Sequence, residues 1–271
     1  MRRFAAIAGA ISLLSGCGPA GPPGAGAARS SAAPTVAVAP TSSATHPEQS
    51  PPEPIGWKLS DLPTFPPAPL PERVVLPQAE SAAFLGRIPT TQRVAFLTID
   101  DGFVKTAEAP KLIAAAHLPV TLFLTSDAVQ ENPAYFAPMR ANGAVIEAHT
   151  ITHPELRGRS YEFQKHEICG SADRIGTFYG RRPVLFRPPF GDKDATTLRV
   201  VKECGMQAAI FWRETVNEGK VRYQEGDAVQ PGDIILMHFR PAFVQDFLGA
   251  LRAIHRAGLI PALLEDYLVT S

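Results

Sequence analysis

The 271-residue sequence has no excess of charge of either sign. Its 26 Lys and Arg residues are matched by 26 Asp and Glu residues, so the formal net charge is zero. It also lacks a run rich in Lys and Arg, which proteins that bind nucleic acids generally carry. The charge pattern therefore argues against nucleic acid as the main partner.

Cysteine is scarce, with only three residues in the chain. Cys17 lies near the N-terminus, which leaves Cys169 and Cys204 as an even pair. In an exported protein such a pair can form one disulfide. The alternative is two small buried residues that are not bonded, and the sequence leaves both possibilities open.

The apolar run near the N-terminus is too short to span a bilayer comfortably. It extends from Phe4 to Leu14 and follows a short basic start at Arg2 and Arg3. A basic start before an apolar run of this length is typical of a secretory signal. We therefore expect residues 1–17 to be a signal peptide and not part of the fold.

The end of this run suggests a lipid anchor. Leu14-Ser15-Gly16-Cys17 resembles the lipobox of bacterial lipoproteins. In that family the cysteine is lipidated and becomes the new N-terminus. The resemblance implies lipidation of Cys17 and anchoring at the outer face of the cell membrane. The alternative is an ordinary signal peptide that happens to contain a cysteine, which would give a secreted protein.

The next part of the chain divides by composition. Residues 18–56 are dominated by Ala, Pro, Gly, Ser and Thr, which bury too little apolar surface to offset their conformational entropy. We expect them to form a disordered tether. Residues 57–92 stay rich in proline but add apolar and aromatic residues, so we expect an irregular collar against the domain. Residues 93–271 are enough for one domain with a sizeable core.

Within that domain, apolar runs typical of strands alternate with helical patterns. The expected strands are 93–99, 120–125, 144–148, 184–187, 207–212, 233–239 and a shorter one at 259–264. Strands that alternate with helices predict a parallel sheet buried on both faces. The spacing fits either an open doubly wound sheet or a small barrel. In both architectures, catalytic groups gather at the C-terminal ends of the strands.

The unusual polar residues lie at the ends of these expected strands. They are Asp100, Asp101, His149, His153, Arg187 and His238. His149 and His153 are four residues apart, close enough to face one site if the chain makes a helical turn. Two imidazoles and a carboxylate would make a catalytic zinc site with a position left for water. One aspartate would then bind the metal while its neighbour moves protons.

Four segments resemble the ordered motifs of polysaccharide deacetylases, the NodB-homology domains of carbohydrate esterase family 4. They are Thr98-Ile-Asp-Asp-Gly102, His149-Thr-Ile-Thr-His153-Pro154, Arg187-Pro-Pro-Phe-Gly191 and Leu236-Met-His238. The resemblance covers about residues 93–265. It implies a distorted (β/α) barrel of about seven parallel strands.

The resemblance also implies roles for individual residues. Asp101, His149 and His153 would hold a divalent metal, commonly zinc. Asp100 would act as the general base, and Arg187 would pair with it.

The remaining motif positions would contact the substrate. His238 would be the general acid, and Leu236 would line the acetyl pocket. The backbone N–H of Phe190 would help to stabilise the oxyanion.

The sequence departs from the family in one further motif, the family's fourth, which falls between Arg187-Pro-Pro-Phe-Gly191 and Leu236-Met-His238. Members typically have an Asp-x-x-Asp-Trp-like element there, with one carboxylate orienting the catalytic histidine. The corresponding stretch, residues 211–217, contains no aspartate. Glu214 is the candidate substitute for orienting His238, and the alternative is a solvated glutamate without a role. Trp212 is the candidate wall of the sugar groove.

These inferences predict a metal-dependent hydrolase that removes N-acetyl or O-acetyl groups from a cell-surface polysaccharide. Peptidoglycan and chitin-like oligomers are the expected partners, and the membrane is reached through the lipid anchor. Two alternatives are a non-catalytic glycan-binding module on the same fold and a related hydrolase of small amides. The altered fourth motif is the sequence feature that favours the binding module.

Overall fold

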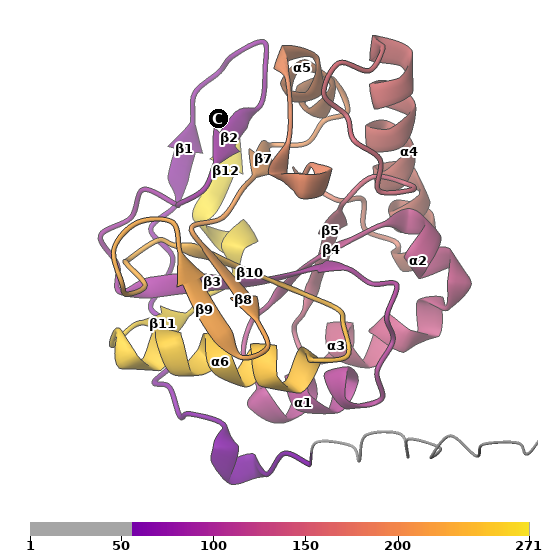
Figure 1. Ribbon diagram of the computed structural model, residues 1–271. Coiled ribbons are helices and arrows are strands. Elements are labelled where there is room, and N and C mark those ends of the chain that lie inside the picture. The colour runs from indigo at the N-terminus through magenta and orange to yellow at the C-terminus, as the bar shows by residue number, and fades with distance from the viewer. Residues whose placement is uncertain (1–55, 271) are drawn as a thin grey trace, which may run out of the picture. The chain divides into compact units, whose positions relative to one another are not determined.

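The computed structural model describes residues 56–270 (Figure 1). The expected signal peptide, Cys17 and all but the last residue of the expected tether lie outside the described residues. Within residues 56–270, none of the helices is long and apolar enough to cross a membrane.

A parallel sheet that curls into a half-barrel forms the centre of the domain. Its strand order is β2-β7-β6-β5-β4-β3-β10-β8-β9, and β11 also pairs with β3. The strands are β2 (Ala83–Leu85), β3 (Val94–Asp101), β4 (Thr121–Leu124), β5 (Val145–Ala148), β6 (Leu185–Phe186), β7 (Ala208–Ile210), β8 (Glu214–Asn217), β9 (Lys220–Tyr223), β10 (Ile234–His238) and β11 (Ile260–Pro261). All neighbours pair in parallel except β8 and β9. Each expected strand is found, and the architecture is the expected distorted (β/α) barrel.

Two short strands correct the expectation of an irregular collar over residues 57–92. β2 joins the edge of the main sheet beside β7, and β1 (Val74–Leu76) pairs in parallel with β12 (Leu268–Thr270). Both strands have three residues, which is too few for an alternating pattern to stand out. Their partners are also distant in the chain, which local sequence does not reveal. Because both strands belong to sheets of the domain, the folded domain begins earlier than residue 93.

The helices cover the sheet on its outer side. They are α1 (Glu108–Ala116), α2 (Ser126–Glu131), α3 (Ala137–Ala141), α4 (Tyr161–Tyr179), α5 (Ala195–Glu203) and α6 (Phe243–Arg256). Four 3-10 turns accompany them: η1 (Leu59–Asp61), η2 (Pro133–Phe136), η3 (Pro189–Gly191) and η4 (Leu264–Tyr267). In Figure 1, α1 and α6 lie together along one side of the sheet, and α4 and α5 lie together on another.

The disulfide that the sequence left open is formed. Cys169 in α4 bonds to Cys204, which caps the C-terminus of α5. The bond therefore links the two helices that pack together beside β5, β6 and β7.

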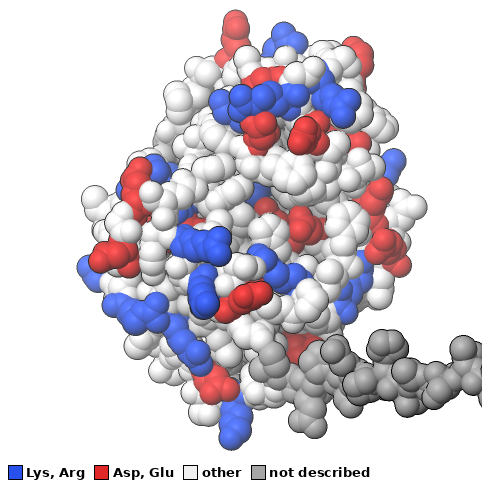
Figure 2. Space-filling view, viewed as in Figure 1, with Lys and Arg blue, Asp and Glu red and all other residues white. Residues whose placement is uncertain are grey.

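Apolar packing holds the strand ends in place. All of β3 is buried except Asp101, and β4 and β7 are buried along their whole length. The register of β10 sets His238 opposite Asp100. Because neighbouring parallel strands end at the same edge, the last residues of β3 and β10 meet there with the residues that follow β5 and β6. On the face seen in Figure 2, basic and acidic side chains are interspersed, in keeping with the zero net charge.

Candidate metal centre and active site

Residues at or near the strand ends surround one cavity of about 430 Å³. It is lined by Asp100, Asp101, His149, His153, Phe190, Trp212, Thr215, Leu236 and His238. The structure thus brings together eight of the residues that the sequence analysis singled out and adds Thr215. Arg187 lies directly behind the cavity, in contact with Asp100.

Asp101, His149 and His153 are arranged as a metal site. Each offers one ligand atom, and these atoms lie within 4.8 Å of one another. Asp101 Oδ1 is 3.5 Å from His149 Nε2 and 3.4 Å from His153 Nε2. This oxygen is buried and has no hydrogen-bond partner, a costly arrangement that a bound cation would relieve. Two imidazoles and a carboxylate suit zinc, so the three residues fit a divalent metal.

A hydrogen bond fixes the ring of His149 for this task. Its Nδ1 lies 2.7 Å from the backbone oxygen of Arg187, which can only accept a hydrogen. The hydrogen is therefore on Nδ1, and Nε2 faces Asp101 with its lone pair. Burial alone would lower the pKa of His149, but the carboxylates of Asp100 and Asp101 outweigh it and raise that pKa.

The loop that carries both histidines is held from α4. Glu167 accepts hydrogen bonds from the backbone N–H groups of Ile151 (2.9 Å) and Thr152 (3.0 Å). Thr150 Oγ1 accepts another from the N–H of His153 (3.0 Å). The sequence analysis missed Glu167, because nothing local in a helix reveals which distant loop one of its buried carboxylates will bind.

Left-handed backbone conformations cluster at this site. Asp101 (φ 78°), Thr150 (69°), His153 (63°) and Phe190 (60°) are four of the six described non-glycine residues with positive φ. Such conformations are unfavourable for residues with a side chain and are found mainly where function requires them. At Asp101, the turn of the chain directs this carboxylate away from the path of the strand, and so separates it from Asp100.

Asp100 is paired with a fully buried arginine. Arg187 Nη1 donates to Asp100 Oδ1 (2.6 Å) and to Thr98 Oγ1 (2.8 Å), and Nη2 donates to the backbone oxygen of Phe211 (3.1 Å). The guanidinium also lies over the ring of Phe123, 4.3 Å from its centroid. Burial lowers the pKa of Arg187, and the charge of Asp100 opposes this. The pair confirms the expected partnership and fixes the orientation of the Asp100 carboxylate.

His238 has a different partner from the one expected. Its Nδ1 lies 2.8 Å from Nη2 of Arg240. Burial lowers the pKa of His238, and Arg240 acts in the same direction against the opposing charges of Asp100 and Asp101.

The prediction that Glu214 orients His238 is wrong. Glu214 is buried in β8, where burial, followed by a hydrogen bond with Asp233 and the charge of Asp233, raises its pKa to about 9. Arg87 completes this group by donating to Asp233 Oδ1 (2.5 Å). Successive side chains of a strand point to opposite sides, so Thr215 lines the cavity where Glu214 does not.

Aromatic residues form the exposed rim of the cavity. Trp212 lines it, as expected, and stacks on Phe211 with 4.2 Å between ring centroids. Phe190 is 63 % exposed. Its ring packs edge-to-face with the ring of His153, with 4.8 Å between the ring centroids. Leu236 supplies the apolar floor. The rim therefore offers flat apolar surfaces beside the candidate metal site.

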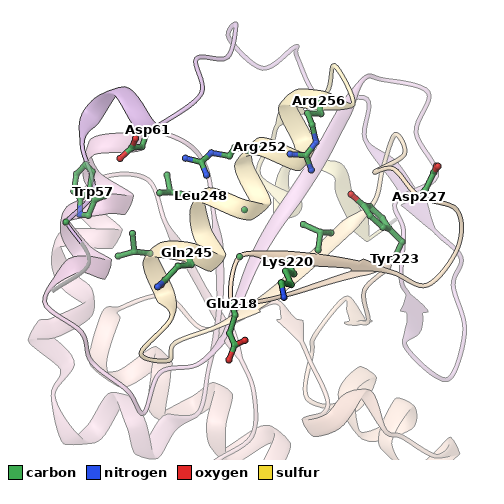
Figure 3. A pocket seen from close by; sticks show the side chains of 15 residues that line it. Trp57, Asp61, Glu218, Lys220, Tyr223, Asp227, Gln245, Leu248, Arg252 and Arg256 are labelled. Carbon is green, nitrogen blue, oxygen red and sulfur yellow. The ribbon is translucent and has the colours of Figure 1, made fainter. Parts of the chain in front are cut away.

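A second cavity of about 770 Å³ lies between η1, the β8–β9 hairpin and α6 (Figure 3). Arg252 and Arg256 of α6 line it together with Tyr223 of β9. It shares no lining residue with the first cavity and contains no histidine. The chemistry of the metal centre, and not the size of the cavity, therefore identifies the candidate active site.

Sequence comparison relates this domain to known proteins. Residues 87–209 match the family model described as polysaccharide deacetylase. An uncharacterised protein of Streptomyces coelicolor is 41 % identical over 152 residues, which are 55 % of this chain and 60 % of that protein. The peptidoglycan-N-acetylmuramic acid deacetylase PdaA of Bacillus subtilis is 25 % identical over 70 % of this chain and 76 % of its own. The chain thus spans less than two thirds of the Streptomyces relative.

Solved structures share the fold. PdaA of Bacillus subtilis, a family 4 carbohydrate esterase, superimposes with a TM-score of 0.57 and 21 % identity over 69 % of this chain and 85 % of its own. A family 4 pseudoenzyme from Bacillus anthracis gives a TM-score of 0.57 and 18 % identity over 69 % of each chain. The matched family model agrees with the motif-bearing strand ends, so residues 87–209 resemble the polysaccharide deacetylase family in sequence, and the domain shares the fold of family 4 carbohydrate esterases.

Proposed function

We propose that this protein is a metal-dependent deacetylase that hydrolyses N-acetyl groups of a cell-surface polysaccharide. The observation that carries the proposal is the cluster of Asp101, His149 and His153 beside the Asp100–Arg187 pair, in one cavity with His238. A metal, a base and a hydrogen donor are the groups that amide hydrolysis needs.

The metal would be held by Asp101, His149 and His153, with zinc as the first candidate. When bound, a divalent metal polarises the acetyl carbonyl and lowers the pKa of a water molecule from about 15.7 toward about 7. The hydrogen bond from His149 Nδ1 and the loop held by Glu167 keep the ligands oriented for it.

The proton transfers belong to residues of the chain. Asp100 takes a proton from the attacking water as the water oxygen bonds to the carbonyl carbon. The carbon–nitrogen bond then breaks, and the nitrogen receives a proton, which gives acetate and a free amine. His238 lines the same cavity and would donate its Nε2–H to the departing nitrogen. The proton held by Asp100, which lies opposite His238 in the strand register, would replace it on Nε2, so that Asp100 is ionised and His238 neutral again. The N–H of Phe190 is the proposed donor to the oxyanion.

Peptidoglycan is the substrate that we propose first. The lipobox-like segment ending at Cys17 supports anchoring outside the cell membrane, within reach of the cell wall. PdaA, which is named as a peptidoglycan deacetylase, supports the same class, and a chitooligosaccharide deacetylase is also among the matched relatives. Chitin-like oligomers and O-acetylated glycans are therefore the next substrates to test.

A second candidate function is glycan binding without turnover. Two observations favour it: a solved family 4 neighbour is a pseudoenzyme, and the carboxylate that orients the histidine in the family is replaced here by Arg240. The base, the hydrogen donor and the possible metal ligands are all present in the cavity, which favours catalysis.

Acetate release tests the proposal directly. The purified protein is offered peptidoglycan and N-acetylglucosamine oligomers, first after treatment with a chelator and then after zinc is restored. We expect release that stops with the chelator and returns with zinc. Stoichiometric zinc binding without release from any substrate would contradict the proposal and favour the binding module.

A further inference from the structure

The guanidinium of Arg240 occupies the position behind His238. Nη2 lies 2.8 Å from His238 Nδ1 and donates to the backbone oxygen of Val216 (3.2 Å). Nη1 donates to the side-chain oxygen of Asn217, and Nε lies 3.2 Å from Asp246 Oδ2. Arg240 is thus held by the end of β8 and by α6 while it contacts the ring of His238.

The carboxylate of Asp246 on α6 is itself held in place. Asp246 is fully buried, and its Oδ1 accepts a hydrogen bond from the N–H of Gly219 (2.9 Å) in the β8–β9 turn. A buried carboxylate needs a partner, and the arginine lies beside its other oxygen. Asp246 therefore fixes Arg240, and Arg240 in turn fixes His238.

Arginine can only donate hydrogen bonds, so His238 Nδ1 must be the acceptor. The single hydrogen of the neutral ring is then on Nε2, the nitrogen that is not occupied by Arg240. A carboxylate at this position would impose the reverse arrangement, because it would accept a hydrogen from Nδ1. A cation in place of the family's carboxylate thus changes which ring nitrogen of His238 carries the hydrogen.

We propose that Arg240, held by Asp246, is a positioning residue that fixes His238 as the neutral tautomer with its hydrogen on Nε2, directed to the substrate. This inference rests on the proposed function, in which His238 donates to the departing nitrogen. It explains how His238 would be held in a chain whose fourth-motif stretch places no carboxylate against it. Without Arg240, the ring would lose its anchor and populate both tautomers.

Nitrogen NMR of the full chain in detergent, with ¹⁵N-labelled histidine and without metal, tests the tautomer independently of catalysis. The chain has seven histidines, and the signal of His238 is the one that disappears in His238→Gln. We expect Nδ1 to give the signal of a bare ring nitrogen and Nε2 that of a protonated one. A wild-type ring protonated on Nδ1 would overturn the proposal.

Substitutions of Arg240 give the second arm of the test. Arg240→Gln should mix the two tautomers, and Arg240→Lys, which still donates, should restore the Nε2–H form. Asp246→Asn provides a milder variant, since it keeps the size of the side chain but loosens the hold on Arg240. Arg252→Gln is the matched control, because Arg252 is an exposed arginine of α6 that does not line the catalytic cavity.

Kinetics then separate positioning from a structural role. Arg240→Gln should lower kcat at least about tenfold, with KM and zinc stoichiometry little changed, and Arg240→Lys should recover much of the loss. If Arg240→Gln leaves both the tautomer and kcat as in the wild type, the proposal is wrong. If no form of the protein releases acetate, the proposed function fails, and the NMR spectra still decide the tautomer.

Discussion

At the scale of single residues, two adjacent aspartates have separate tasks. Asp100 continues the strand and contacts Arg187, whereas Asp101 turns into a left-handed conformation and faces His149 and His153. This separation resolves the repulsion that two neighbouring carboxylates would otherwise suffer, because each has a different set of positive or metal-binding partners.

Substitution of Asp100 should separate catalysis from metal binding. We expect Asp100→Asn to lower the rate of acetate release by at least about a hundredfold, because an amide cannot take up a proton from water. Zinc content, measured on the same sample, should stay at the wild-type level, whereas His149→Ala should lose the metal. Full activity of Asp100→Asn would show that another group is the base.

Zinc affinity should fall at low pH. The carboxylates around His149 raise its pKa in the metal-free protein, so the proton that competes with the metal is retained to higher pH than on an ordinary histidine. We expect zinc affinity, measured by competition with a chelator, to weaken as the pH decreases and His149 takes up this proton. His166→Gln, at an exposed position of α4, is the control and should follow the wild-type curve.

At the scale of secondary structure elements, the buried Glu214 in β8 makes the stability of the fold depend on pH. Its pKa is about 9 in the folded chain, against an ordinary value of 4.5. Between these values the unfolded chain has released the proton and the folded chain keeps it, so unfolding releases a proton. The free energy of unfolding should therefore decrease as pH rises from about 4.5 to about 9.

The variant Glu214→Gln checks two conclusions about this residue: that it makes stability depend on pH, and that it has no part in catalysis. An amide can donate to Asp233 as a protonated carboxyl does, so the slope of stability against pH should flatten, as measured by urea unfolding at several pH values. Acetate release should stay close to the wild-type rate, because Glu214 does not line the cavity. A changed pH–rate profile would return Glu214 to the catalytic machinery.

The disulfide between α4 and α5 should contribute to stability without affecting catalysis. Cys169 and Cys204 are 35 residues apart, and closing a loop of this length stabilises a fold by about 2–4 kcal/mol. We expect Cys169→Ser with Cys204→Ser to lower the free energy of unfolding by that amount. Acetate release measured well below the melting temperature should be unchanged. An equal stability of the two forms would indicate a strained or redundant bond.

At the scale of the whole molecule, the membrane anchor remains a prediction from the N-terminal sequence. If Cys17 is lipidated, the full chain should partition into the detergent phase of a Triton extraction, and Cys17→Ser should move it to the aqueous phase. The same distribution of both forms would favour an ordinary signal peptide.

The sequence was sufficient for the features that depend on local pattern. The seven expected strands, the cluster of Asp101, His149 and His153 and the pairing of Asp100 with Arg187 follow from buried runs and from the motifs at their ends. The orientation of His238 could not be predicted in this way, because Arg240 is fixed by a carboxylate on α6 and by the end of β8. The strands β1 and β2 were missed since each has only three residues and a distant partner.

The edge strand β2 also sets a limit on how the protein can be shortened for expression. A fragment that starts at residue 93 would keep every motif residue but lose β2 and leave the edge of β7 unpaired. It would also lose Arg87, the partner of buried Asp233. Open sheet edges recruit other chains, so such a fragment should aggregate even though its active site is complete in sequence. The smallest useful recombinant form therefore begins ahead of β1, at about residue 56.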